Sequence, residues 1–155
     1  FQISDMIQRI QTVFLLLSII VLGLFLWFPL IAVESPNFSD VVQGWGVGVS
    51  WVFNDQPYIY LINSILTGTA IGISLLNIFV YKKRTLQMLL CWFAIILIAS
   101  AEGFVFFKYQ TKVFVGDVIL TPWNLLAAAA VVLQLLAFYF IRKDEELVRS
   151  LDRLR

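Results

Sequence analysis

Apolar residues fall into four long runs along the chain, and short polar segments separate these runs. The runs cover residues 12–33, 58–81, 88–107 and 123–141, and Glu102 is the only charged residue inside them. A helix needs about 20 apolar residues to cross a bilayer, and each run reaches that length. Backbone groups in hydrocarbon must be paired within their own segment, so we expect helices. The pattern predicts an all-α membrane protein, built as an antiparallel bundle of four transmembrane helices.

Basic residues are distributed unevenly among the segments that flank these runs. The outer loops 34–57 and 108–122 carry only Lys108 and Lys112. The other nine of the 11 lysines and arginines are Arg9, Lys82, Lys83, Arg84, Arg142, Lys143, Arg149, Arg153 and Arg155. Since cytoplasmic segments of membrane proteins are enriched in lysine and arginine, this bias predicts that both termini are cytoplasmic.

Composition agrees with a bilayer as the solvent and narrows the chemistry. The 155 residues are 61% apolar and 14% charged, and a single small domain has too little interior to hide that much apolar surface from water. We therefore expect residues 1–155 to form one membrane domain. Histidine is absent, Cys91 is the single cysteine and the net charge is +1. These features argue against a metal or haem cofactor, a nucleic-acid partner and an enzyme, while bound lipids remain compatible with the sequence.

The two outer loops contain signals for β-structure. Residues 41–53 combine valines and tryptophans with Gly44, Gly46 and Gly48, and residues 112–120 place Gly116 and Asp117 between β-branched arms. A glycine next to an aspartate in that setting is a hairpin signal. We expect a small β-structured cap outside the cytoplasm, and a partly buried irregular loop is the alternative.

Glu102 is the candidate for intramembrane chemistry, because a carboxylate in hydrocarbon is costly unless it is protonated, paired or hydrated. Asn63 is expected at a similar depth in the second run, where it can serve as a hydrogen-bond partner. A structural role for Glu102 is favoured over a role in transport, because no chain of carboxylates crosses the membrane with it.

Small residues recur every four positions in the second run, at Ser64, Gly68 and Gly72. This spacing creates a groove that lets another helix backbone approach closely. We favour packing inside the same bundle, with residues 127–130 of the fourth run as the opposite surface. A helix of a partner protein is the alternative.

The tail, residues 142–155, is expected to extend the fourth helix into the cytoplasm. Leu147, Leu151 and Leu154 recur at three- and four-residue intervals and form an apolar stripe. Together with Arg9, Lys82, Lys83 and Arg84, this stripe is a candidate docking surface on the membrane or on a partner. A solvated extension of the helix is the equally weighted alternative.

Three segments resemble the signatures of an uncharacterised family of four-span inner-membrane proteins from Bacteroidota. They are residues 6–12 (MIQRIQT), residues 82–87 (KKRTLQ) and residues 141–155 (IRKDEELVRSLDRLR). The resemblance covers essentially the whole chain and implies a bacterial cytoplasmic membrane as the location. It implies no catalytic residues, because the family has no established activity.

Our leading hypothesis from the sequence is a non-catalytic accessory or scaffold subunit of a larger membrane complex. Short loops, the small-residue groove and the charged tail motivate it. A small transporter or a protein that conducts ions or protons through Glu102 is the alternative. An enzyme that acts on lipids or quinones is the weakest hypothesis, because histidine and paired intramembrane carboxylates are missing from the sequence.

Overall fold

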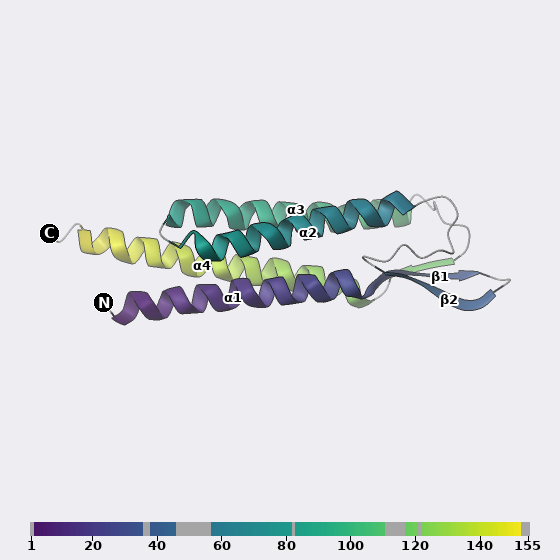
Figure 1. Ribbon diagram of the computed structural model, residues 1–155, viewed down its shortest axis with the longest axis horizontal. Helices are drawn as coiled ribbons and strands as arrows, with labels where there is room; N and C mark the ends of the chain where they lie inside the picture. Colours follow the sequence, from purple (N-terminus) through teal and green to yellow (C-terminus); the bar gives the residue numbers. More distant parts are fainter. Residues whose placement is uncertain are drawn as a thin grey trace.

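The fold is an elongated bundle of four helices with a small sheet at one end (Figure 1). The computed structural model describes the backbone of residues 2–35, 38–45, 57–81, 83–110, 117–120 and 122–152, and side chains within residues 10–28, 62–81, 83–107 and 122–150. The helices are α1 (Gln2–Trp27), α2 (Pro57–Phe79), α3 (Arg84–Gln110) and α4 (Leu125–Asp152), and the short 3-10 helix η1 (Pro122–Asn124) precedes α4. All four long helices contain a segment that is long and apolar enough to cross a membrane.

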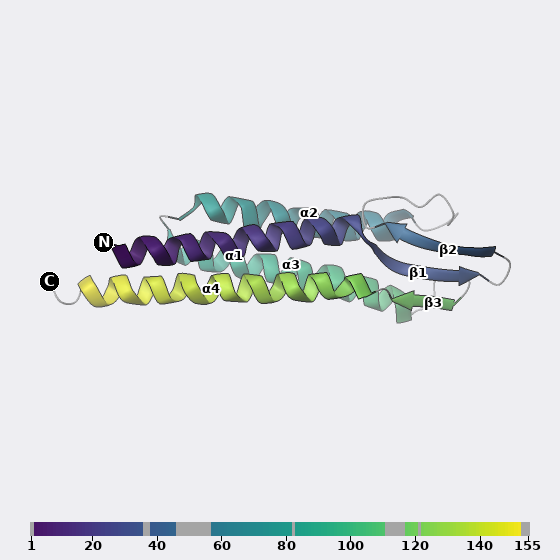
Figure 2. The ribbon, with the colours of Figure 1, turned by 90° about the horizontal axis from the view of Figure 1, so that it is seen from below.

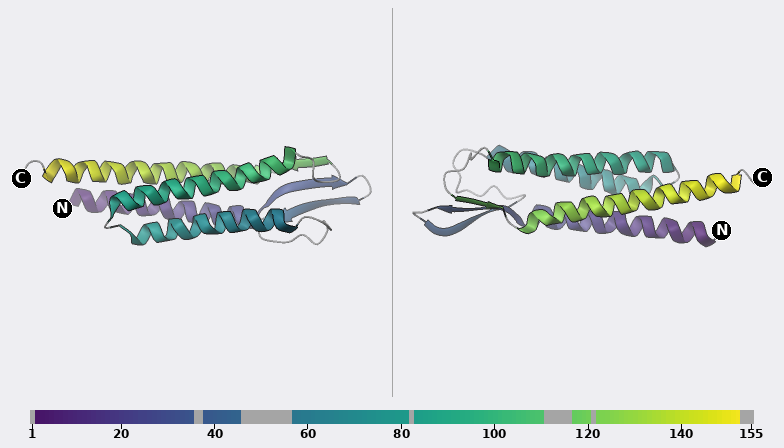
Figure 3. Two further views of the ribbon diagram at one scale, coloured as in Figure 1. Left: turned by 90° about the horizontal axis from the view of Figure 1, so that it is seen from above. Right: turned by 180° about the vertical axis from the view of Figure 1, so that it is seen from behind.

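Successive helices run in opposite directions, so each end of the bundle has a distinct set of segments. Both termini and the turn between α2 and α3 lie at one end, which we call the terminal end, and the sheet lies at the other (Figures 1 and 2). Packing is most extensive between α1 and α4 and between α2 and α3. The views from above and from behind show the same arrangement, with both termini at one end and the sheet at the other (Figure 3).

The first run does not form one helix across its predicted length. Residues 12–33 were expected to span the membrane, but α1 begins earlier and ends at Trp27, and Pro29 opens a strand. Proline lacks a backbone N–H and restricts the residue before it to extended conformations, while Ile31 and Val33 are β-branched and favour a strand. The segment of α1 that is apolar enough to cross a membrane is therefore Ile10–Trp27, 18 residues long.

Three strands form an antiparallel sheet beyond the helices. They are β1 (Pro29–Ser35), β2 (Phe38–Trp45) and β3 (Asp117–Leu120), in the order β2-β1-β3. Val33 pairs with Val42 on one side and with Val118 on the other. The central strand is therefore a segment that the sequence assigned to the membrane, while the expected hairpin at residues 112–120 is described only from Asp117 onward.

Buried positions in every helix recur at alternating intervals of three and four residues. In α2 they are Asn63, Thr67, Ala70, Ser74 and Asn77, and in α4 they are Ala127, Ala130, Gln134, Ala137, Ile141 and Asp144. This average period of 3.5 residues is that of coiled-coil packing, in which the buried positions of each helix interlock along one seam. The seam of this bundle is made mainly of small and polar residues.

The outward surface carries the large apolar side chains instead. Phe79 and Leu125 are each 71% exposed, and Leu76 and Ile65 are each 58% exposed. A soluble bundle places such residues inside and its polar residues outside. The reversed distribution is the one that a lipid environment stabilises, because hydrocarbon solvates the apolar exterior while the polar groups pair in the interior.

Candidate functional site

A hydrogen-bond network centred on Gln134 joins three helices in the middle of the bundle. Nε2 of Gln134 donates to Oγ of Ser74 at 2.6 Å and to Oγ of Ser18 at 3.2 Å, and Oγ of Ser74 donates to the carbonyl oxygen of Ala70 at 2.8 Å. Gln134, Ser18 and Ser74 are all buried. The network links α1, α2 and α4 at one level, and interhelical bonds of this kind contribute about 0.6–2 kcal/mol each.

A second network clamps α2 to α3 next to their turn. Nδ2 of Asn77 donates to the carbonyl oxygen of Gln87 at 3.3 Å, and Nε2 of Gln87 donates to the carbonyl oxygen of Asn77 at 3.1 Å. Nδ2 of Asn77 also lies 3.1 Å from Sγ of Cys91. The buried thiol of Cys91 therefore belongs to a structural contact.

An ion pair ties α3 to α4 at the terminal end. Nε of Arg84 donates to Oδ2 of Asp144 at 2.7 Å, and the side chain of Asp144 is only 5% exposed. Arg84 was assigned to a candidate docking surface, but this contact gives it a structural role in the bundle. The sequence analysis did not single out Asp144.

The half of the bundle near the sheet contains polar atoms without partners among the described residues. They include Nδ2 and Oδ1 of Asn63, Oγ1 of Thr67 and Oε1 of Glu102. One atom each of Asn77, Gln134 and Asp144, in the middle and at the terminal end, also lacks a partner there, but these residues form hydrogen bonds through another atom. Asn63 and Thr67 are each 1% exposed and lie one helical turn apart. An unsatisfied buried polar group costs about 1–3 kcal/mol, and such groups are uncommon in native interiors. These three residues, which share one half of the bundle, are the candidate functional site.

Glu102 and Asn63 share a level in the bundle but do not form the hydrogen bond that the sequence suggested. Asn63 lies about four turns before Asn77, and Glu102 lies about four turns after Gln87, so the antiparallel clamp puts them at the same depth. However, neither polar atom of Asn63 has a hydrogen-bond partner in the part of the chain that the structure describes, which includes Glu102. The expected pairing is therefore wrong, because Asn63 occupies the buried seam while Glu102 is half-buried at its flank.

The glycines of α2 also differ from expectation. Gly68 and Gly72 are exposed, and a Cβ atom built on either would meet no atom of the described residues within 4 Å. Packing of these glycines inside the bundle, the favoured interpretation, is therefore wrong. Ala70 makes the close approach instead, because it shares a core cluster with Ala127 and Ala130 of α4. Ser64, the third member of the small-residue pattern, is half-buried.

The other candidate docking residues are only partly described. Lys83 is exposed, and Leu147 is 39% exposed. The side chains of Arg9, Lys82, Leu151 and Leu154 lie outside the described residues. The helix itself continues through the tail to Asp152, as predicted.

Thr67, Ser18 and Ser74 were not among the expected site residues, although the sequence contains a signal for them. Polar and small residues in α2 recur at 63, 67, 70, 74 and 77, which is the 3.5-residue period of a buried seam. In a membrane helix the polar positions mark the interior, so their spacing identifies the seam better than the apolar positions do. Among the described residues, no cluster of three acidic or cysteine side chains could hold a metal ion.

The helices, their apolar exterior and the polar seam define a protein of the multi-pass membrane class. A family model described as a domain of unknown function, DUF4293, matches residues 7–154. Because the match covers almost the whole chain, the protein belongs to this family. This confirms the resemblance to an uncharacterised family, while the assignment to Bacteroidota stays a prediction. No curated protein and no solved structure matches the chain.

Proposed function

We propose that this protein is a non-catalytic accessory or scaffold subunit of a larger complex in the bacterial cytoplasmic membrane. In this proposal both termini face the cytoplasm. The excess of basic residues near the termini and the turn between α2 and α3 supports this orientation, since these segments lie at the same end of the bundle (Figure 1).

The outward-facing pair Gly68 and Gly72 is the observation that carries the proposal. Glycines four residues apart let two helix backbones approach closely in a membrane, where van der Waals packing drives association. Because no side chain among the described residues approaches either glycine, this surface can accept a helix outside the bundle. The large apolar residues Ile65, Leu75 and Leu76 on the same helix are exposed and extend that surface.

The test is to compare the proteins that co-purify with the natural chain and with variants of this surface. Purification from native membranes in a mild detergent, followed by quantitative mass spectrometry, is expected to give a stoichiometric membrane partner. Gly68→Leu and Gly72→Leu should remove that partner, because leucine fills the space that the partner helix needs. Gly103→Leu is the matched control, since Gly103 of α3 is also exposed and has nothing within 4 Å of its Cβ position.

Two results would contradict the subunit role. One is a chain that purifies alone or only with copies of itself. The other is a partner that survives the Gly68 and Gly72 substitutions but is lost with Gly103→Leu. Circular dichroism of each variant establishes that the four helices are retained.

A second candidate function is a small transporter or a channel for ions or protons that uses Glu102. The cluster of unpartnered polar atoms on Asn63, Thr67 and Glu102 favours it, because such groups can coordinate a passing ion or water molecule. A continuous path would also have to pass the level of Gln134, where Ser18 and Ser74 are already hydrogen-bonded. Flux assays in proteoliposomes separate the two functions: transport requires a flux that Glu102→Gln abolishes, whereas the subunit role requires none.

A further inference from the structure

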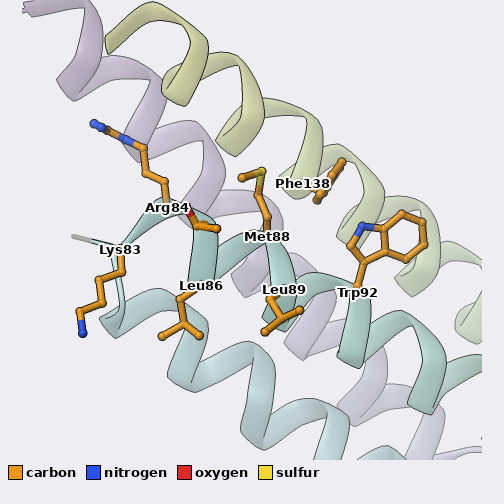
Figure 4. Close-up of a pocket in the computed structure, with 8 residues that line it drawn as sticks. Lys83, Arg84, Leu86, Met88, Leu89, Trp92 and Phe138 are labelled. Atoms are coloured by element: carbon orange, nitrogen blue, oxygen red, sulfur yellow. The ribbon is translucent and has the colours of Figure 1, made fainter. Parts of the chain in front are cut away.

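A shallow groove of about 810 Å³ lies along α3 and α4 at the terminal end of the bundle (Figure 4). Lys83, Arg84 and Thr85 form its polar end, and the wall that follows includes Met88, Trp92 and Phe138. The side chains of Trp92 and Phe138 meet edge to face, with ring centroids 5.7 Å apart. The groove thus has basic residues at one end and an apolar wall beyond them, with the flexible side chain of Lys83 extending away from Phe138 (Figure 4).

The polar end of the groove lies at the start of α3. No acidic side chain is present there to accept hydrogen bonds from the first backbone N–H groups of the helix. The carbonyl oxygen of Lys83 accepts the N–H of Gln87 at 3.0 Å, so Lys83 occupies the N-cap position. A lysine side chain has no acceptor atom and cannot cap the helix, and the first turn contains no acidic residue. The partial positive charge of this helix end adds to the charge of Lys83 and favours an anion.

Nearby acidic residues of α4 are already matched by arginines. Asp144 pairs with Arg84, Glu145 pairs with Arg149, and Glu146 pairs with Arg142. Lys83 is exposed and forms no ion pair with the side chains that the structure describes. Lys83 therefore contributes an unneutralised positive charge at the polar end of the groove.

The apolar wall continues from this end into the membrane-spanning part of α3. Trp92 is eight positions beyond Arg84, which is about 12 Å along the helix. Trp92 is 48% exposed and its neighbour Leu89 is 51% exposed. Tryptophan is enriched at the level where headgroups meet hydrocarbon, and basic residues there attract anionic headgroups.

We propose that this groove binds an anionic phospholipid, with the phosphate at Lys83 and the start of α3 and an acyl chain along Met88, Trp92 and Phe138. A partner helix would need the apolar wall but not the cationic end, so the charge distribution favours a lipid. The inference requires only that the helices lie in a bilayer, and it does not depend on the subunit role proposed above.

Quenching of Trp92 fluorescence by brominated lipids tests the proposal at the groove itself. Phenylalanine replaces Trp27, Trp45, Trp51 and Trp123, so that Trp92 is the single tryptophan. The variant is reconstituted into vesicles that mix phosphatidylcholine with phosphatidylglycerol, with bromine on one lipid or the other. We expect phosphatidylglycerol to be preferred at Trp92 by about fivefold, which corresponds to about 1 kcal/mol for one basic residue near a headgroup.

Lys83→Gln should reduce this preference to near parity. Lys143→Gln is the matched control, because it removes the same charge at the same end of the bundle, while Lys143 is exposed and does not line the groove. The control should keep the preference. Equal quenching by both lipids in the parent, or an equal loss in the two lysine variants, would overturn the proposal.

Native mass spectrometry repeats the test with all natural tryptophans in place. The chain is purified in detergent, exposed to equal amounts of phosphatidylglycerol and phosphatidylcholine, and measured with its retained lipids. One phosphatidylglycerol molecule should stay bound to the natural chain and to Lys143→Gln, with about fivefold less on Lys83→Gln. The proposal would be contradicted if Lys83→Gln retained as much phosphatidylglycerol as the natural chain. It would also be contradicted if the natural chain retained phosphatidylcholine at the same level as phosphatidylglycerol.

Discussion

Buried polar residues in the two halves of the bundle differ in whether their side chains form any hydrogen bond to a neighbouring helix. Toward the termini, Asn77, Gln87 and Asp144 form hydrogen bonds that hold neighbouring helices together, although Oδ1 of Asn77 and Oδ1 of Asp144 have no partner among the described residues. Toward the sheet, Asn63 and Thr67 are just as buried, but their side-chain polar atoms find no partner among the described residues. Burial of a polar residue in a membrane helix therefore does not show that the residue holds helices together, whereas its hydrogen bonds do.

Different interactions therefore hold the helices together in different parts of the bundle. The clamp at Asn77 and Gln87 and the ion pair at Arg84 and Asp144 fix the helices at one end, and the Gln134 network fixes them in the middle. The half near the sheet relies on apolar contacts of Phe25, Leu22 and the alanines of α4. We expect the half near the terminal end to dominate stability.

The largest effect is expected from Asp144→Ala. This change leaves the guanidinium of Arg84 without its partner, and removing one member of a buried pair costs about 3–5 kcal/mol. Because the side chain of Arg84 is 32% exposed, we expect a loss near the lower limit, about 3 kcal/mol. Denaturant unfolding in detergent micelles, followed by circular dichroism, measures it. An effect below about 1 kcal/mol would show that the ion pair is not a main support of this end.

The comparison between the halves is tested most directly by replacing each asparagine of α2 with leucine. Asn77→Leu removes a donor to Gln87 and should lower the free energy of unfolding by about 1–2 kcal/mol. Asn63→Leu removes two buried polar atoms without partners and should raise it by about 1 kcal/mol. Both residues are 1% exposed and share one helix, so each is the control for the other. Equal losses would mean that Asn63 is hydrogen-bonded in the folded protein.

Alanine substitutions of the exposed glycines should have smaller, stabilising effects on the isolated chain. Alanine is favoured over glycine by about 0.8–1 kcal/mol in the interior of a helix, and the added methyl group at Gly68 or Gly103 meets no neighbour. Thermal unfolding in detergent should therefore show a slightly higher transition temperature for both variants. A destabilised Gly68→Ala would place an undescribed part of the chain against α2.

The smallest effect is expected from Glu146→Gln. This substitution breaks the pair between Glu146 and Arg142, whose side chains are 66% and 65% exposed. Exposed ion pairs four residues apart contribute about 0.3–0.5 kcal/mol. The same unfolding measurement should place this variant within about 0.5 kcal/mol of the parent. A loss comparable to that of Asp144→Ala would indicate that the tail packs against a segment beyond the described residues.

The sequence predicted best those features that depend on one segment of the chain alone, such as the existence of each helix. Four apolar runs predict four long helices, because the requirement to pair backbone groups in hydrocarbon acts within each run. The helical tail also followed from its own periodicity. The predicted end of the first helix was wrong, because α1 ends at Trp27 and a strand begins at Pro29. Hydrophobicity alone does not separate the end of a membrane helix from the start of an apolar strand.

The amino-acid sequence alone determined the solvent, the number of helices and the antiparallel order that short connections impose. Only the tertiary structure decided that Arg84 pairs with Asp144, that Gly68 and Gly72 face outward, and that Asn63 and Glu102 do not bond. These outcomes depend on how each helix is rotated about its own axis. That rotation is fixed jointly by all four seams, because every helix must bury its own 3.5-residue stripe against the others at once.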